Sequence, residues 1–380
     1  MHRNSAKVLG LSVALGFGVL LSAGIEVRAQ SPSPNVHHFA GGLNNPRGLK
    51  FGPDGNLYVA EGGRGGAIST IGQCEQVPAA GPYTGDFTAR ISKINANGER
   101  TTVVDNLPSS QTNPGLGSLV SGVADVAFVG NTLYALVAGA GCSHGLAGTA
   151  NGIIRVNHNG TWRLVADLSA FQKAHPVANP DLADFEPDGT WYSMVAVRGH
   201  LFAVEPNHQE IDRINPLNGQ IHRIVDLSPT RSEWVGPTSI AYQGDFYVGN
   251  LSEFPIQPGA SQVRRITASG HVTVVETNLT AVLGVAFDHE GYMYVLENTT
   301  VSGLPTPFTG KVLRVTDDRV EEIATGLFLP TAMTFGPDRA LYVSNVGFGP
   351  PPVGMGEIVR ITVPPAEEQH EGRQSHRFDD

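Results

Sequence analysis

The residues Gly52-Pro53-Asp54-Gly55-Asn56-Leu57-Tyr58-Val59-Ala60-Glu61 join a tight turn to a short apolar strand. Proline, aspartate and glycine favour turns, whereas aromatic and β-branched residues favour strands. The apolar-aromatic pair of this strand recurs along the chain. Its six copies are Leu57-Tyr58, Leu133-Tyr134, Leu201-Phe202, Phe246-Tyr247, Met293-Tyr294 and Leu341-Tyr342. The chain is therefore built from one structural unit that is repeated six times.

A second pattern follows each pair, a strand of alternating apolar residues with a basic residue at a fixed place. Its copies are Ile91-Ser92-Lys93-Ile94, Ile153-Ile154-Arg155-Val156, Ile211-Asp212-Arg213-Ile214, Val263-Arg264-Arg265-Ile266, Val312-Leu313-Arg314-Val315 and Ile358-Val359-Arg360-Ile361. Turn-forming pairs such as Asn97-Gly98 come next, and a further strand such as Val274-Val275 pairs back. Four strands per unit, repeating every ~40 to 50 residues in the later copies, predict an all-β, six-bladed β-propeller.

Composition also favours many short strands over helices. The chain holds 46 Gly and 26 Pro, and only 16% of its residues are charged. Turn-forming residues on this scale interrupt a chain too often for long helices. The first two repeats are longer than the rest, and their excess lies in stretches at 62–87, 139–152 and 170–189. We interpret these stretches as loops inserted between strands rather than as additional blades.

The last repeat ends after Ile358–Val363 without a fourth strand, while the segment His37–Leu43 near the N-terminus has no strand partner of its own. That segment has the same pattern as the fourth strand Glu321–Leu327. We therefore predict that it completes the last blade and closes the ring, which removes an exposed sheet edge. The propeller would span residues 30–363, and the polar segment 364–380 is expected to be a disordered tail.

The first residues resemble an export signal. Arg3 and Lys7 precede an apolar run, and Val27-Arg28-Ala29 resembles a cleavage site, so we predict a signal peptide over residues 1–29 that is cleaved after Ala29. An uncleaved membrane anchor is the rival interpretation, because the run approaches the ~20 residues that span a bilayer. No later segment is apolar enough to span a membrane. The mature protein is expected to be secreted or periplasmic.

Export also bears on the cysteines and on the partner. The chain has two cysteines, Cys74 and Cys142, and disulfides persist outside the cytoplasm, so we predict a bond between them. The formal net charge of −10 argues against a nucleic-acid partner, because proteins that bind nucleic acid need a basic surface.

The segments Leu43–Leu49, Gly52–Glu61 and Gly62-Gly63 resemble the start of the ScyD/ScyE family, and the resemblance covers nearly all of the mature chain through the later Leu-Tyr-Val patterns. These are exported proteins that are associated in cyanobacteria with the pigment scytonemin. The resemblance implies an exported propeller with a role in processing secondary metabolites outside the cytoplasm.

More broadly, the Pro-Asp-Gly turn is similar to those of NHL-repeat proteins, gluconolactonase-type lactone hydrolases and soluble quinoprotein sugar dehydrogenases. Many activities share this turn, so it indicates fold more than function. At the places of the gluconolactonase metal ligands, this chain has Asn45-Pro46-Arg47 and Ala60-Glu61-Gly62.

In a propeller, the loops before the innermost strands and after the second strands emerge on one face, around the mouth of the central channel. Five of the six second strands end in a carboxylate or an amide. These residues are Glu61, Glu205, Asn250, Glu297 with Asn298, and Asn345. Arg47 and Asp125 are expected beside them at the starts of innermost strands, with Glu233 as a further candidate. We predict that these residues form a ligand-binding site for a small molecule or a protein.

Within this set, Glu61, Glu205, Asn250, Glu297 and Asn345 are hard oxygen ligands that suit Ca²⁺ or Mg²⁺. Arg47 could orient an anionic or carbonyl oxygen of the ligand. A metal that polarises a carbonyl, together with a Glu as base, could hydrolyse lactones or esters.

Structural interpretations compete with these functional ones. Residues at strand ends can cap backbone groups or hold channel waters without any ligand. The basic residue of each third strand is expected to be solvated or to pair with a neighbouring blade, and His144 is expected at the surface. No nucleophilic motif and no phosphate-binding glycine loop is recognisable. Two functions remain open, a binding propeller and a metal-dependent hydrolase of small carbonyl compounds.

Overall fold

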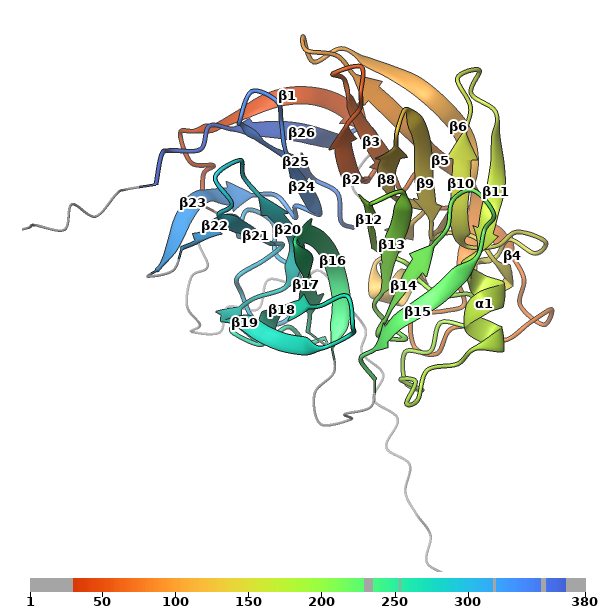
Figure 1. Ribbon diagram of the computed structural model, residues 1–380. Helices are drawn as coiled ribbons and strands as arrows, with labels where there is room; N and C mark the ends of the chain where they lie inside the picture. The colour runs from red at the N-terminus through yellow and green to blue at the C-terminus, as the bar shows by residue number, and fades with distance from the viewer. Residues whose placement is uncertain (1–29, 229–234, 253, 317–318, 350–352, 367–380) are drawn as a thin grey trace, which may run out of the picture.

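The computed structural model describes residues 30–228, 235–252, 254–316, 319–349 and 353–366. Its strands form six sheets arranged around a centre (Figure 1). The predicted signal peptide, Glu233 and residues 367–380 of the predicted tail lie outside the described residues. No helix among the described residues is long and apolar enough to cross a membrane.

Each blade is an antiparallel sheet whose first strand lies nearest the centre of the ring (Figure 1). Blade 1 contains β2 (Pro46–Phe51), β3 (Leu57–Glu61), β5 (Thr84–Ile94) and β6 (Arg100–Gln111), with the short β4 (Ile68–Ser69) and β7 (Val120–Ser121) at its edges. Blade 2 contains β8 (Val123–Val129), β9 (Thr132–Val137), β10 (Gly152–Val156) and β11 (Trp162–Asp167), and blade 3 contains β12 (Ser193–Val197), β13 (His200–Glu205), β14 (Glu210–Ile214) and β15 (Ile221–Asp226).

Blades 4 and 5 follow the repeat with few additions. Blade 4 contains β16 (Gly236–Gln243), β17 (Asp245–Leu251), β18 (Ser261–Ile266) and β19 (Val272–Leu279), and blade 5 contains β20 (Val282–Phe287), β21 (Met293–Glu297), β22 (Gly310–Val315) and β23 (Val320–Leu327). The helical elements are η1 (Pro114–Leu116), η2 (Cys142–His144) and α1 (Leu168–Ala174), all in or beside the segments that lengthen the first repeats.

Blade 6 confirms the predicted closure of the ring. It contains β24 (Ala332–Phe335), β25 (Leu341–Asn345) and β26 (Gly356–Ile361), and its outer strand is β1 (Val36–Leu43) from the other end of the chain. The pairing runs from Val36 opposite Ile361 to Leu43 opposite Gly356. Ser33 N also donates to the Thr325 carbonyl of β23, so the chain start contacts blade 5 as well.

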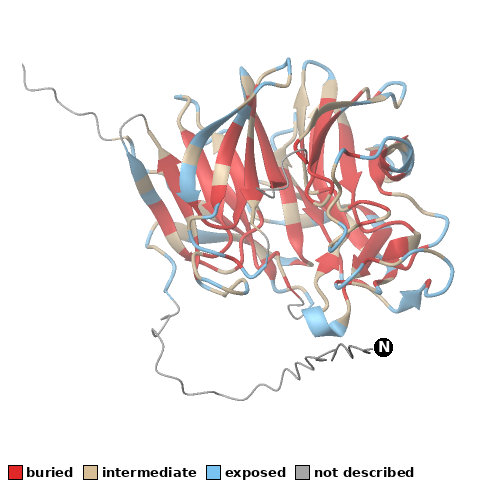
Figure 2. Cartoon of the chain, turned by 90° about the horizontal axis from the view of Figure 1, so that it is seen from below, coloured by how far each residue is buried: buried red, intermediate tan, exposed pale blue. Residues whose placement is uncertain are grey.

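In blades 1, 4, 5 and 6, the aromatic residue that marks the second strand packs edge to face against a phenylalanine on the first strand of the following blade. Tyr58 meets Phe128 edge to face with ring centroids 5.0 Å apart, and Tyr294 meets Phe335 in the same way at 4.9 Å. Tyr342 of blade 6 packs on Phe51 of blade 1, so the contact continues across the closure. Burial follows this arrangement, because the strands are buried between blades and exposed residues lie at the rim (Figure 2). The repeated aromatic residue therefore holds neighbouring blades together.

The two ends of the ring differ. We call the end at which the second strands finish the mouth face, and the end that carries the turns between first and second strands the turn face. The insertions at 62–87 and 139–152 extend from the mouth face of blades 1 and 2. The third insertion, 170–189, connects blade 2 to blade 3 and contains the end of α1.

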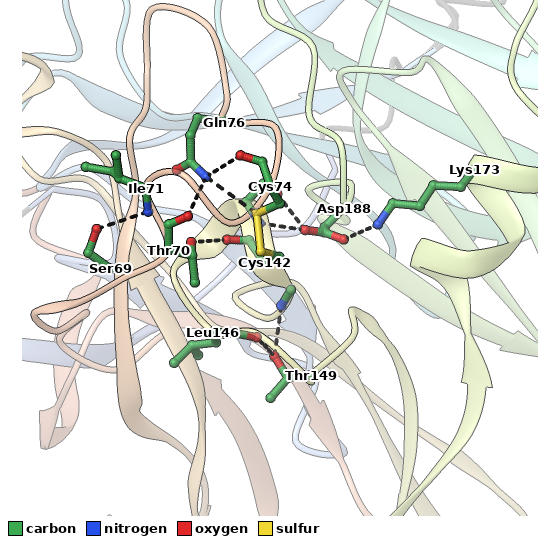
Figure 3. Close-up of a disulfide and its surroundings, with 12 residues drawn as sticks. Ser69, Thr70, Ile71, Cys74, Gln76, Cys142, Leu146, Thr149, Lys173 and Asp188 are labelled. Atoms are coloured by element: carbon green, nitrogen blue, oxygen red, sulfur yellow. Dashed lines mark hydrogen bonds and ion pairs between the residues drawn. A yellow bond between two sulfur atoms is a disulfide. The ribbon is translucent and has the colours of Figure 1, made fainter.

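The predicted disulfide joins the first two insertions. Cys74 and Cys142 are bonded, with their Cα atoms 6.2 Å apart, and Thr70 Oγ1 donates to the Cys142 carbonyl beside them (Figure 3). Asp188 of the third insertion accepts from Ser143 N at 2.7 Å and from Ser143 Oγ at 2.8 Å, which ties the third insertion to the second. The three insertions thus form one connected layer over blades 1 to 3.

Ring closure can be tested by deleting residues 30–43. We expect the truncated chain to aggregate or to melt far below the parent, because two strand edges lose their partner. Size-exclusion chromatography and thermal unfolding would measure this. Deletion of residues 367–380, which has the same length, controls for chain loss as such. A truncated chain that stays monomeric with the parent's melting temperature would contradict the closure.

The disulfide can be tested with the C74S/C142S variant. The bond encloses a 68-residue separation, for which chain entropy gives a stabilisation of about 4 kcal/mol. We expect most of this loss in denaturant unfolding, and the same loss in the parent after reduction. Equal unfolding midpoints for the oxidised parent and the variant would show that the insertions are held by other contacts.

Candidate functional site

Glu61, Glu205 and Glu297, the carboxylates predicted at the ends of second strands, are buried, and each binds the segment that leads into its own blade. Glu61 Oε2 accepts from Asn44 N at 2.6 Å, Glu205 Oε1 from Thr190 N at 2.7 Å, and Glu297 Oε1 from Thr280 N at 2.6 Å. Asn345 Oδ1 accepts from Phe328 N at 2.8 Å in the equivalent place of blade 6. This shared position therefore has a structural role, since it ties each incoming segment to a second strand.

The two other predicted amides also bind backbone groups. Asn250 Oδ1 accepts from Gln262 N at 2.8 Å, and Asn298 Nδ2 donates to the Pro330 carbonyl at 2.8 Å. Over the described residues, no group of three or more His, Cys, Asp or Glu side chains is placed to hold a metal ion. The calcium or magnesium site remains a prediction from the repeat.

The three carboxylates differ in whether the residue opposite them on the third strand is a cation that neutralises their charge. Glu61 pairs with Arg90, whose Nε lies 2.7 Å from Oε1, and Glu297 faces Lys311 with Nζ at 3.4 Å from Oε2. Glu205 instead faces a second carboxylate, Glu210, on the neighbouring strand. Burial raises the pKa of Glu205 and of Glu210 to about 7. Glu210 is paired with Arg223 of β15, so Glu205 is the carboxylate that has no cation directly opposite it. Blade 3 therefore has two opposed carboxylates where blades 1 and 5 have a carboxylate and a cation.

Arg47 lies at the centre of the mouth face with a tyrosine and a phenylalanine. Its guanidinium donates to the Val120 carbonyl and lies 5.9 Å from the ring centroid of Phe348. Tyr192, which leads into blade 3, reaches across the ring and donates to the Thr331 carbonyl of blade 6 at 3.4 Å. Burial raises the pKa of Tyr192, and the nearby Arg47 partly offsets this. A cation and a phenol from different blades thus meet over the channel.

Asp125 lies below this group, where blades 1, 2 and 3 meet. Its Oδ2 accepts from Met194 N at 2.7 Å and from Ser193 Oγ at 3.2 Å, both on the first strand of blade 3. Residue 48 must be glycine, because a Cβ there would lie 1.8 Å from Asp125 Oδ1. Burial raises the pKa of Asp125, although Lys50 opposes the shift. Asp125 therefore joins first strands and is less accessible than Arg47.

A second polar group lies under the layer of insertions, and its members come from separate segments. Tyr83 OH donates to Glu186 Oε1 at 2.7 Å, and His144 Nε2 lies 3.5 Å from Glu186 Oε2. Ser110 Oγ lies 2.8 Å from His144 Nδ1. All four side chains are buried, so this serine, histidine and glutamate are closed to solvent.

Burial dominates the chemistry of this group. It raises the pKa of Glu186 to about 8 and lowers the pKa of His144 to about 4. At neutral pH, Glu186 is therefore largely protonated and His144 is neutral. The expectation that His144 lies at the surface is wrong, because the insertions fold over it and leave it with 0% exposure.

Sequence reasoning found Arg47 and Asp125 but missed Tyr83, Glu186 and Tyr192. Each of these three lies in a segment between blades or within an insertion. Such segments have no counterpart in the other repeats, so the repeat does not predict where their side chains lie. A weak signal exists for Tyr192, because it directly precedes the first strand of its blade, as Arg47 lies near the start of β2. No local motif marks Tyr83 or Glu186, whose contact joins residues 103 positions apart.

Comparison with known proteins supports the fold. No protein-family model and no curated protein matches this chain. A solved structure of a candidate oxidoreductase (glucose dehydrogenase) from Thermus thermophilus is similar at 18% identity and TM-score 0.52, covering 86% of this chain and 99% of that one. A glucose dehydrogenase is similar at 15% identity and TM-score 0.50, covering 87% and 100%. A gluconolactonase from Xanthomonas campestris aligns at 10% identity and TM-score 0.49, covering 86% and 89%.

The protonated state of Glu186 can be tested through the pH dependence of stability. A carboxyl whose pKa is raised on folding stabilises the protein at low pH, and this contribution is lost as pH rises toward about 8. Between pH 6.5 and 8.5, we expect the parent to lose stability, with Glu205 and Glu210 adding to the loss. The pKa of His144 is lowered on folding from its ordinary value of 6.5, so its contribution has the opposite sign and is confined to the lower end of this window.

The variant E186Q should show a smaller loss over the same interval, because the amide cannot ionise. Denaturant unfolding at each pH measures the slope, which should fall by up to about one proton. The exposed Glu290 provides the control variant E290Q. Identical slopes for the parent and E186Q would mean that Glu186 is ionised in the folded protein.

Proposed function

We propose that this protein is an exported β-propeller that binds a small organic molecule at its mouth face. The single observation that carries the proposal is the group of Arg47, Tyr192 and Phe348 over the channel. Arg47 has a backbone carbonyl as acceptor and no ion-pair partner among the described residues. Its remaining donors could therefore bind an anionic or carbonyl oxygen of the ligand.

The loops around this group suggest the rest of the ligand. Large apolar side chains are exposed on connections between second and third strands, all of which leave the mouth face. They include Ile71 at 64% exposure, Leu304 at 65% and Val353 at 65%, with Phe254 and Met355. Exposed apolar side chains that share one face of a protein can contribute to a binding surface. We infer a ligand with an apolar body and a polar head that contacts Arg47.

These loops are also held in place, as a binding surface requires. Ile256 and Gly303 exchange two backbone hydrogen bonds, which join the loops of blades 4 and 5. Gly354 N donates to Asn44 Oδ1 at 2.9 Å and fixes the loop of blade 6 to blade 1. Because the loops are paired, the apolar side chains are presented at less entropic cost on binding.

Location and pathway are part of the proposal. The disulfide is compatible with a protein outside the cytoplasm. The resemblance to the ScyD/ScyE family suggests a role in processing secondary metabolites there. The metal-dependent hydrolase remains the alternative function, with Glu61, Glu205 and Glu297 as its proposed ligands.

Binding at the mouth can be tested with the variants R47Q and R90Q. Aromatic carboxylates and their neutral esters would be screened by thermal shift, and hits measured by calorimetry. We expect R47Q to weaken carboxylate binding by about tenfold or more, because a charge-assisted hydrogen bond is lost. R90Q is the matched control, since Arg90 binds Glu61 within its own blade. Equal affinities for the parent and R47Q would overturn the proposal.

The hydrolase alternative needs a separate measurement. The purified protein would be incubated with small lactones and esters, with Ca²⁺, Mg²⁺ or EDTA. Turnover that requires metal and is lost in E205Q would favour the hydrolase. Binding through Arg47 without metal-dependent turnover would favour the binding propeller.

A further inference from the structure

The basic residue of each third strand has an acidic partner in four of the blades. Lys93 Nζ lies 3.8 Å from Asp54, Arg265 Nη2 lies 2.6 Å from Asp245, and Arg360 Nη2 lies 2.8 Å from Asp338. In blade 5, Arg314 Nε donates to Glu321 at 2.7 Å. The sequence predicts solvation or pairing with a neighbouring blade, and the structure differs, because each of these partners belongs to the cation's own blade.

Blades 2 and 3 depart from this pattern. Arg155 and Arg213 make no side-chain hydrogen bond or ion pair within the described residues. In blade 4, the partner Asp245 is the first residue of the second strand. The residues in that place are Thr132 in blade 2 and His200 in blade 3. The place that holds the partner carboxylate in blade 4 therefore has no carboxylate in blades 2 and 3.

Arg155 is the more constrained of the two cations. It is half-buried, and its Nε is shielded from solvent without an acceptor. The side chain directly opposite it on β11 is Arg163, and the one opposite it on β9 is Tyr134. Directly opposed residues project from the same face of a sheet, and like charges in such pairs repel. The side chain of Arg163 also has no hydrogen-bond or ion-pair partner among the described residues.

The surroundings add positive charge rather than remove it. Tyr134 belongs to the same buried apolar cluster as Met194 and Leu201 of blade 3, so the face of the sheet that carries Arg155 is turned toward that blade. The connection that follows those strands at the turn face contains Arg198, which is exposed. No carboxylate of the described residues lies within 4.0 Å of the charged nitrogens of Arg155, Arg163 or Arg198. An uncompensated basic patch thus lies on a protein whose formal net charge is −10.

We propose that Arg155 and Arg163 form an oxyanion site at the turn face between blades 2 and 3. The ligand group is a tetrahedral phosphate or sulfate, either free or carried as an ester on a larger molecule. Two opposed guanidinium groups offer planar donors that match such an anion and gain when it relieves their repulsion. Arg198 contributes to the local potential. The site lies at the opposite end of the ring from Arg47 and is independent of the function proposed for the mouth.

The repeat supplies matched variants for a test. R155Q removes the constrained cation, whereas R265Q removes its counterpart in blade 4, whose charge is already neutralised by Asp245. T132D introduces a carboxylate in the place that Asp245 has in blade 4. We expect T132D to pair with Arg155, to abolish anion binding and to raise the melting temperature.

The full chain would be titrated with inorganic phosphate and sulfate by calorimetry and thermal shift at low salt, with chloride as reference. Dextran sulfate, against neutral dextran, tests the ester form of the same group. We expect R155Q to weaken binding by about tenfold or more, and R265Q to bind as the parent does. Tight binding of dextran sulfate with weak binding of the free ions would assign an ester ligand.

Two outcomes would overturn the proposal. Equal anion affinity for the parent, R155Q and T132D would show that the patch is not a site. An equal loss in R155Q and R265Q would show a general effect of net charge. Melting curves of each variant without added anion keep loss of binding distinct from loss of fold.

Discussion

The hydrogen-bonded pairing of β1 with β26 is the contact on which the whole ring depends. A propeller blade packs only on its two neighbours, so a ring of blades has no core that would survive an opening. By supplying the fourth strand of blade 6 from the N-terminus, the chain removes two sheet edges at once and brings Tyr342 onto Phe51. The same aromatic contact that joins consecutive blades thereby continues around the circle, and the position of every residue over the channel follows from it.

The fold could be predicted because short sequence patterns that recur along the chain determine it. Strand alternation, the aromatic residue of each second strand and the glycine turns are short-range features, and six copies make each of them unambiguous. The missing strand of blade 6 and the orphan segment near Phe39 identify each other by the same logic. The disulfide could be predicted from the expected export of the chain and from the positions of the two cysteines in neighbouring insertions.

The candidate site was harder to predict, because equivalence in a repeat gives the face of a residue and not the direction of its side chain. Glu61, Glu205 and Glu297 do lie at the ends of second strands, but the nearest unpaired donors are backbone amides of the incoming segments, and the carboxylates turn to them. The polar group under the insertions could not be predicted from the sequence for another reason. Glu186 meets Tyr83 and His144 only after three irregular segments fold over one another, and nothing periodic sets their register.

Each blade of a repeated structure serves as a reference for the others, and the departures in this chain are not spread evenly. The long insertions and the disulfide lie on blades 1 to 3, the opposed carboxylates Glu205 and Glu210 lie in blade 3, and the unneutralised arginines lie in blades 2 and 3. Blades 4 to 6 keep the charge pairing of the repeat on their third strands. A buried carboxylate without a cation opposite it, such as Glu205, and an arginine without a carboxylate partner, such as Arg155, both cost stability. A fold that needs only six similar sheets gains nothing from either. Their concentration on one half of the ring therefore indicates that this half has been shaped by something other than the requirements of closure.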